Sequence, residues 1–192
     1  MQTRKSKEKI YSLHEPDVLC ISKGKSHKKY EFGNKVSIVR SKKGLIVGAL
    51  SFRNEYDGHT TNKALEQIFR LTGVVPEILA GDRGYRGHKT EAISEHTEVV
   101  IPSNPKKKDS YYQKKKKRKL FNSRASIEPI IGHLKTDHRL GRNFYKGMIG
   151  DAINVMLAAA AFNFKRAMKT LLCLVFQMKN RQVFTKYLLA YS

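Results

Sequence analysis

Two carboxylates that lie far apart in the sequence, Asp82 and Glu128, have surroundings suited to chemistry. Asp82 follows an apolar run and Glu128 lies in a segment of helical spacing, so only folding could bring their carboxyl groups together. Converging carboxylates repel each other unless a divalent cation lies between them, and hard oxygen ligands suit Mg²⁺ or Mn²⁺. Such ions activate water or a 3′-hydroxyl for attack on a phosphodiester. The pair therefore indicates metal-assisted chemistry on nucleic acid, whereas the plainer interpretation of a lone Asp after a strand is a turn.

The segment 121–135 would present Glu128 among cations on one side of a helix. Arg124, Glu128 and Lys135 fall within roughly 40° of one line along a helix, and interleaved isoleucine and leucine side chains supply a face that can dock on a core. Pro129 lacks an amide donor, so the helix either starts or kinks there. If it starts there, the positive end of the helix dipole favours the ionised carboxylate that a metal needs. The plainer alternative is a surface helix whose charges form ordinary ion pairs.

The elements ahead of Asp82 are predicted to be a hairpin and a strand–helix–strand unit. Residues 31–40 and 45–53 are apolar, β-branched runs separated by Ser-Lys-Lys-Gly, which predicts two antiparallel strands. Apolar residues then recur at helical spacing over 64–71, and residues 74–80 predict a buried strand that ends just before Asp82.

Two residues that follow Asp82 could contact a nucleotide. The aromatic ring of Tyr85 and the guanidinium of Arg86 could hold a base and a phosphate. Simple packing is an equally good interpretation of Tyr85.

The second half of the chain begins with a basic stretch and ends with an apolar one. Residues 104–119 hold nine Lys or Arg residues and have no periodic apolar face, which predicts a flexible loop. A long helix of Ala, Phe, Leu and Met is expected to begin near Asp151 and to cover the sheet. Cations at 165, 166 and 169 interrupt its apolar pattern, so no membrane-spanning segment is expected.

The charge balance favours a polyanionic partner. The 192 residues carry 38 Lys and Arg against 16 Asp and Glu, a net charge of +22. Such an excess repels itself unless a polyanion neutralises it, so nucleic acid is the favoured partner, although a membrane surface or a ribosomal setting would explain the same charge. Cys20 and Cys173 stand far apart without metal-ligand spacing, which fits a reducing cytoplasm.

The spacing F-x-x-R-x-x-x-E, followed by six residues and Lys, resembles the Y-x-x-R-x-x-x-E-x-x-x-x-x-x-K signature of the DDE transposases of bacterial insertion sequences, with Phe121 in place of tyrosine. Other segments resemble the group-five branch of that family, among them Y-E-F-G-N-K-V-S-I, D-G-H-T, G-D-R-G-Y-R-G and E-P-I-I-G-H-L-K-T-D-H-R-L-G-R-N. The similarity runs from Lys9 to about Thr170.

This resemblance implies a fold, a chemistry and a setting. The fold would be α/β, a ribonuclease H-like mixed sheet flanked by helices, with a basic lead-in at 1–9, a partial catalytic domain at 10–170 and a helical tail at 171–192. The resemblance implies that Asp82 is the second catalytic Asp and Glu128 the catalytic Glu, both bound to Mg²⁺ or Mn²⁺. Arg124 and Lys135 would contact the DNA backbone. Element ends and target DNA would be the partners, in a bacterial cytoplasm close to the nucleoid.

One part of the family pattern has no evident counterpart, namely the first catalytic Asp on an opening strand in the middle of the sheet. We therefore expect a truncated and inactive C-terminal portion of a transposase, whose sheet lacks its central strand and whose stability is marginal. Asp17 precedes a possible strand, but its surroundings do not match those of the family's first Asp.

Two classes of function follow from these patterns. The chain is either an enzyme fragment of a DNA transposase or a non-catalytic basic DNA-binding protein, which could act as an inhibitor of the full-length enzyme, alone or in a dimer. A basic structural protein of ribosomal type is disfavoured by the Asp82 and Glu128 pair.

Overall fold

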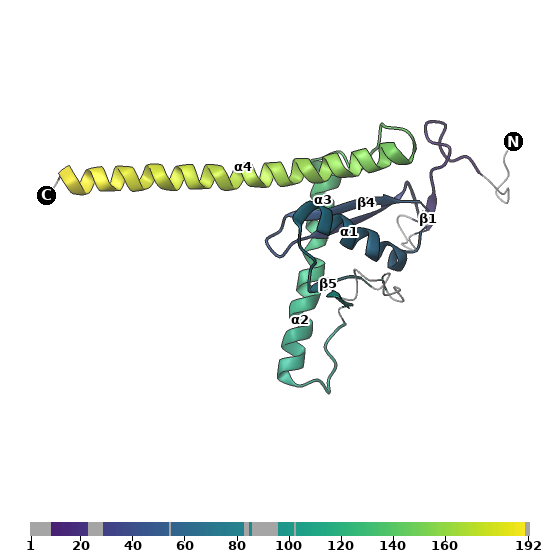
Figure 1. Ribbon diagram of the computed structural model, residues 1–192, viewed down its shortest axis with the longest axis horizontal. Coiled ribbons are helices and arrows are strands. Elements are labelled where there is room, and N and C mark those ends of the chain that lie inside the picture. The colour runs from purple at the N-terminus through teal and green to yellow at the C-terminus, as the bar shows by residue number, and fades with distance from the viewer. Residues whose placement is uncertain are drawn as a thin grey trace.

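The computed structural model describes residues 9–22, 29–53, 55–82, 85, 96–101 and 103–190, with side chains described as far as residue 180. Figure 1 shows a mixed α/β body from which two helices project. Its elements, in chain order, are β1 (Cys20–Ser22), β2 (Tyr30–Phe32), β3 (Lys35–Arg40), β4 (Ile46–Phe52), the short 3-10 helix η1 (Asp57–Thr60), α1 (Thr61–Thr72), β5 (Ile78–Ala80), β6 (Glu98–Val100), α2 (Tyr111–Ala125), α3 (Ile127–Thr136) and α4 (Gly147–Ala190).

The described strands form three separate two-stranded sheets. β1 pairs with β2 and β3 with β4, both antiparallel, whereas β5 and β6 are parallel. The predicted α/β class is confirmed. The ribonuclease H-like sheet stays a prediction, because within the described ranges no strand joins β3 to β5.

The β3–β4 hairpin is the centre of the fold and confirms the predicted pair of strands. Gly44 provides its turn with a φ of +85°, a left-handed conformation that glycine adopts without strain. A Cβ at Gly44 would also lie 2.9 Å from the guanidinium of Arg166, which would have to shift to admit a side chain. The hairpin thus brings its turn against α4.

The outer edge of β4 is closed by two side-chain amides instead of a strand. The Gln67 amide accepts from the N–H of Ala49 at 2.6 Å and donates to its C=O at 3.1 Å. The Asn163 amide does the same for Ile46, at 2.9 and 2.8 Å. Because unpaired backbone groups at a sheet edge are costly to bury, these amides substitute for a neighbouring strand.

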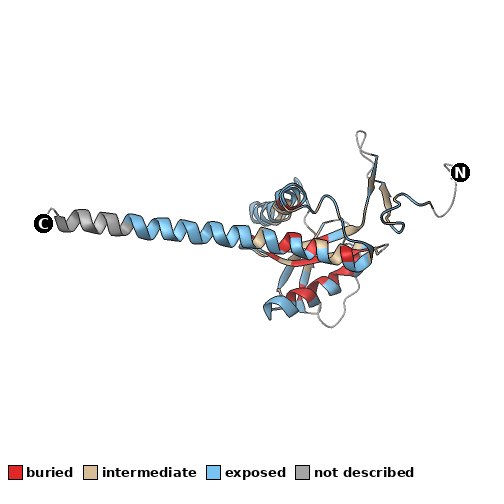
Figure 2. Ribbon diagram, turned by 90° about the horizontal axis from the view of Figure 1, so that it is seen from above, coloured by how far each residue is buried: buried red, intermediate tan, exposed pale blue. Residues whose placement is uncertain are grey.

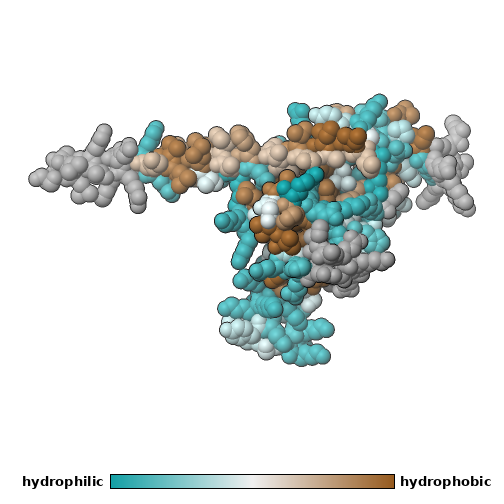
Figure 3. Space-filling model, viewed as in Figure 1, coloured by the Kyte–Doolittle hydropathy of each residue, from teal (hydrophilic) through white to brown (hydrophobic). Residues whose placement is uncertain are grey.

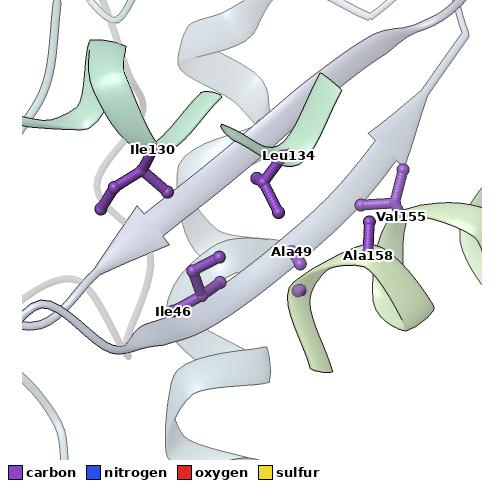
Figure 4. Close-up of a cluster of buried hydrophobic side chains, with 7 residues drawn as sticks. Ile46, Ala49, Ile130, Leu134, Val155 and Ala158 are labelled. Atoms are coloured by element: carbon purple, nitrogen blue, oxygen red, sulfur yellow. The ribbon is translucent and has the colours of Figure 1, made fainter. Parts of the chain in front are cut away.

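The main hydrophobic core lies where α3 and α4 pack on β4. Figure 4 shows its side chains, which come from all three elements: Ile46, Ala49, Ile130, Leu134, Val155, Ala158 and Ala159. The opposite face of the hairpin is covered by α1, since a Cβ at Gly48 would lie 3.5 Å from Ile68. Helix α1 confirms the predicted helix and ends at Gly73, whose φ is +69°.

The predicted buried strand at 74–80 is wrong in extent and in burial. Only Ile78–Ala80 forms a strand, and Val74 and Ile78 are 62% and 55% exposed. Pro76 has no N–H to donate to a ladder, and β5 has a described neighbour on one side only, so little apolar surface covers the run.

The basic stretch 104–119 is also different from its prediction as a loop, because helix α2 begins at Tyr111. Ser110 caps this helix: its hydroxyl accepts from the N–H of Gln113, and the Gln113 side chain accepts from the N–H of Ser110. Of the two options predicted for Pro129, a helix start or a kink, the structure shows a helix start. Helix α2 ends at Ala125, and Pro129 lies in the first turn of α3.

Helix α4 runs continuously from Gly147 to Ala190, and the division at residue 171 between a domain and a helical tail stays a prediction. Its first turns pack on the core as predicted, whereas residues 164–180 are exposed throughout (Figure 2). By length and composition Gly147–Asn180 passes the criteria for a membrane-crossing helix, which the sequence interpretation did not expect. The buried Val155, Ala158 and Ala159 show that part of this apolar character belongs to the protein core.

Candidate active site

Glu128 lies in the first turn of α3, directly after the junction with α2. The guanidinium of Arg40 on β3 donates to the hydroxyl of Ser126 and so fixes this junction to the hairpin. The buried side chains of Ile130 and Leu134, which follow Glu128 along α3, anchor this helix to the core. Glu128 is thus a solvent-facing carboxylate at the positive end of a firmly docked helix.

Arg124 is the cation next to Glu128. Its Nη2 lies 3.6 Å from Glu128 Oε1, and the Glu128 side chain is 65% exposed. An exposed pair of this kind contributes little to stability, so both groups stay available to a ligand. The predicted neighbourhood of these two residues is confirmed, while their predicted roles stay predictions.

Asp82 is exposed and lies just beyond β5. Its C=O accepts from the N–H of Tyr85 at 3.2 Å, which holds Tyr85 close to the end of the strand. β5 contacts α2, the helix that leads into α3 and Glu128 (Figure 1). The two candidate carboxylates therefore belong to elements that are in contact: Asp82 follows β5, and Glu128 lies on the helix that follows α2. That they meet at one metal ion stays a prediction.

Tyr85 connects the turn after β5 to the hairpin. Its hydroxyl lies 3.1 Å from the hydroxyl of Ser37 on β3. A Cβ added at Gly81 would lie 3.2 Å from the Tyr85 Cβ, so the Tyr85 side chain packs closely against Gly81. These contacts favour the packing interpretation of Tyr85 over a base contact. Arg86 lies outside the described residues.

Lys135 is exposed on α3 and, in the described part of the chain, makes no ion pair. The alternative that it binds Asp137 is not realised, because Asp137 instead accepts from Thr136, His133 and Lys165. These hydrogen bonds, that of Thr136 first, lower the pKa of Asp137 to about 2. The Lys135 ammonium is thus left facing solvent.

Asp17 belongs to a different cluster, which sequence reasoning missed. Arg53 lies 3.2 Å from Asp17, 3.1 Å from Glu15 and 2.9 Å from Asp151. Hydrogen bonding to Asp151 is the main cause that raises the pKa of Arg53, and the N–H of Gly147 lowers the pKa of Glu15. The cluster ties the N-terminal segment to β4 and α4. No local pattern announces it, because its members come from three distant parts of the sequence.

Asp82 and Glu128 are chemically suited to a divalent cation. Within the ranges described, no group of three or more His, Cys, Asp or Glu side chains is placed to hold an ion. Mg²⁺, however, is commonly held by only one or two carboxylates and completes its shell with water and substrate phosphates. The two oxygen donors are therefore compatible with Mg²⁺ or Mn²⁺ bound together with DNA.

The chain belongs to the transposase DDE domain family, whose model matches residues 4–164. The match covers both Asp82 and Glu128 and confirms the transposase resemblance of the motifs. No curated protein and no solved structure matches the chain.

Proposed function

We propose that this chain supplies two carboxylates, Asp82 and Glu128, to a metal-dependent centre that cleaves and joins DNA strands during transposition. The observation that carries the proposal is the placement of Glu128, exposed in the first turn of α3 with Arg124 beside it. A surface ion pair would not require a helix anchored by two buried side chains. A catalytic carboxylate requires such an anchored helix, because it must stay in place while charge develops on the reacting phosphate.

Each residue of the site has a role that its position supports. Glu128 and Asp82 would hold Mg²⁺ or Mn²⁺, which supplies activation of the attacking hydroxyl and stabilisation of the leaving oxygen. Arg124 orients the Glu128 carboxylate and offers its free N–H groups to a phosphate. Lys135, which has no carboxylate partner among the described residues, would contact the DNA backbone about two turns further along α3.

The chain on its own would bind DNA without cleaving it. The family pattern requires a third carboxylate, and Asp17, the one candidate, is held by Arg53 together with Glu15 and Asp151. The Asp17 side chain is 77% exposed at the edge of that cluster, and its surroundings in the sequence do not match those of the family's first Asp. The second candidate function, inhibition of a full-length transposase, follows if the chain occupies element ends without cutting them.

The test combines strand cleavage with DNA binding. Purified chain is incubated with duplex DNA with and without Mg²⁺, and nicking is followed beside binding by fluorescence anisotropy. The proposal predicts that the chain does not nick DNA and that Mg²⁺ makes it bind DNA more tightly. Asp82→Asn and Glu128→Gln should each abolish this effect of Mg²⁺ on binding.

Two results would change the account. Nicking that Glu128→Gln abolishes would refute the inactivity of the isolated chain and support the site. Binding that neither Mg²⁺ nor Asp82→Asn alters would refute the metal centre and leave only a basic DNA-binding protein. Glu66→Gln, an exposed carboxylate on α1, is the matched control.

A further inference from the structure

We propose that the outward face of α2 binds the phosphate backbone of duplex DNA. This inference rests on the proposed function, since it requires that the chain binds DNA. The face, called here the α2 cationic face, consists of Tyr111, Tyr112, Lys115, Lys116, Arg118 and Lys119.

Burial of apolar side chains does not explain the position of helix α2. None of its residues is buried, and its start is fixed by the Ser110 and Gln113 capping box. It projects from the body of the protein (Figure 1) as a hydrophilic arm (Figure 3). A helix held out from the core in this way costs conformational entropy with little burial in return, which suggests that its surface has a use.

The cations of α2 are divided between two sides. Lys117 lies on one side, where its ammonium binds Asp109 of the preceding loop at 2.8 Å and its side chain is 30% exposed. The α2 cationic face lies on the other side, within an arc of roughly 160° around the helix. Lys115, Lys116, Arg118 and Lys119 are all exposed and, among the described residues, bind no carboxylate.

The like charges on α2 destabilise the helix that carries them. Lys115 and Lys119 are an i,i+4 pair of like charge, and Lys114 and Arg118 are another, an arrangement that destabilises a helix. A face selected only for solubility would mix both signs of charge. An unmixed cationic face instead fits a partner that supplies closely spaced negative charges.

Duplex DNA is the polyanion that the geometry favours. The α2 cationic face extends over roughly 12 Å of the helix axis, from Tyr111 to Lys119. Duplex DNA carries a phosphate charge about every 1.7 Å along its axis, so a path of this length meets many phosphates. Contacts of this kind position DNA and do not read its sequence.

The test compares two variants that lose the same number of positive charges. The first changes Lys115, Lys116, Arg118 and Lys119 to Gln, and the control changes the exposed Lys42, Lys43, Arg70 and Lys169 to Gln. Glutamine has nearly the helix propensity of lysine, and far-UV circular dichroism checks that α2 persists. Binding to two duplexes of unrelated sequence is measured by fluorescence anisotropy over a range of salt concentrations.

The α2 variant is expected to make the slope of log K against log salt less negative by about two to four, because each lost phosphate contact removes about 0.9. The control variant should change the slope by less than about one, and Lys115→Arg with Lys119→Arg should keep the parent slope. The change should be equal for both sequences.

Equal slope changes in the α2 and control variants would overturn the inference, because they would show a response to net charge alone. An unchanged slope in the α2 variant would also overturn it, while leaving DNA binding by the chain intact. A parent chain that binds neither duplex would overturn the proposed function as well. Preferred binding of the parent to anionic phosphatidylserine vesicles over duplex DNA would reassign the face to lipid and overturn the inference.

Discussion

Replacing Gln67 by methionine tests whether a side-chain amide closes the outer edge of β4. Gln67 is 5% exposed and Ala49 is 6% exposed, and the two hydrogen bonds between them measure 2.6 and 3.1 Å. Methionine has a similar length but neither donates nor accepts as an amide does, so it would leave the N–H and C=O of Ala49 buried and unpaired.

The size of the effect follows from those two groups. Each buried and unsatisfied backbone group costs about 1–3 kcal/mol, and a more apolar side chain returns about 1 kcal/mol. For two such groups, Gln67→Met should therefore lower the free energy of unfolding by about 1–5 kcal/mol, a substantial part of the 5–15 kcal/mol typical of a domain.

Urea unfolding followed by far-UV circular dichroism measures this loss. Glu66→Met, one residue earlier and exposed on the same helix, is the matched control and should change the free energy by less than about 0.5 kcal/mol. If Gln67→Met proved as stable as the parent with an unchanged denaturant slope, the edge of β4 would not need the amide and the reasoning would fail.

Three further predictions concern the anchors of α3 and α4. Leu134→Ala should lower the free energy of unfolding by about 2–5 kcal/mol, since Leu134 is 0% exposed in the core that holds α3, and urea unfolding would show it. The pKa of Asp137 is lowered from 3.8 to about 2, so its stabilising effect is complete above pH 4 and disappears as the pH falls toward 2; a carboxyl NMR titration with a midpoint near 4 would contradict this. Arg53→Met should destabilise the protein more than Lys63→Met in thermal unfolding, because the Arg53 side chain is 18% exposed with three carboxylate partners while the Lys63 side chain is 55% exposed with one.

The elements that sequence predicted correctly have strong local signals. The β3–β4 hairpin is announced by two β-branched runs around a turn that ends in Gly44, and α1 by an apolar stripe that Gly73 ends. A helix that begins close to Pro129 is one of the two options that local backbone chemistry allows, and α3 begins at Ile127.

The failures have physical causes as well. Apolar periodicity does not predict helix α2, because none of its residues is buried; the sequence signal for this helix is the Ser110-x-x-Gln113 capping box. The apolar composition of residues 74–80 predicts a buried strand, but burial depends on neighbours that lie elsewhere in the chain.

Contacts between distant segments were beyond a reading of local pattern. The Gln67 and Asn163 amides and the Arg53 cluster join parts of the chain that no periodicity relates. In the candidate site, helical spacing predicts that Glu128 lies beside Arg124. It does not predict the contact between Tyr85 and Ser37, which joins two segments that are distant in the sequence.

The central claim, that Asp82 and Glu128 serve one divalent ion, is tested most directly by Mn²⁺ binding to the whole chain in the presence of duplex DNA, followed by electron paramagnetic resonance. The account predicts that Asp82→Asn and Glu128→Gln each weaken Mn²⁺ binding at least about tenfold and that the double variant is little weaker than either, because both remove the same site. Unchanged Mn²⁺ binding in either single variant would contradict it.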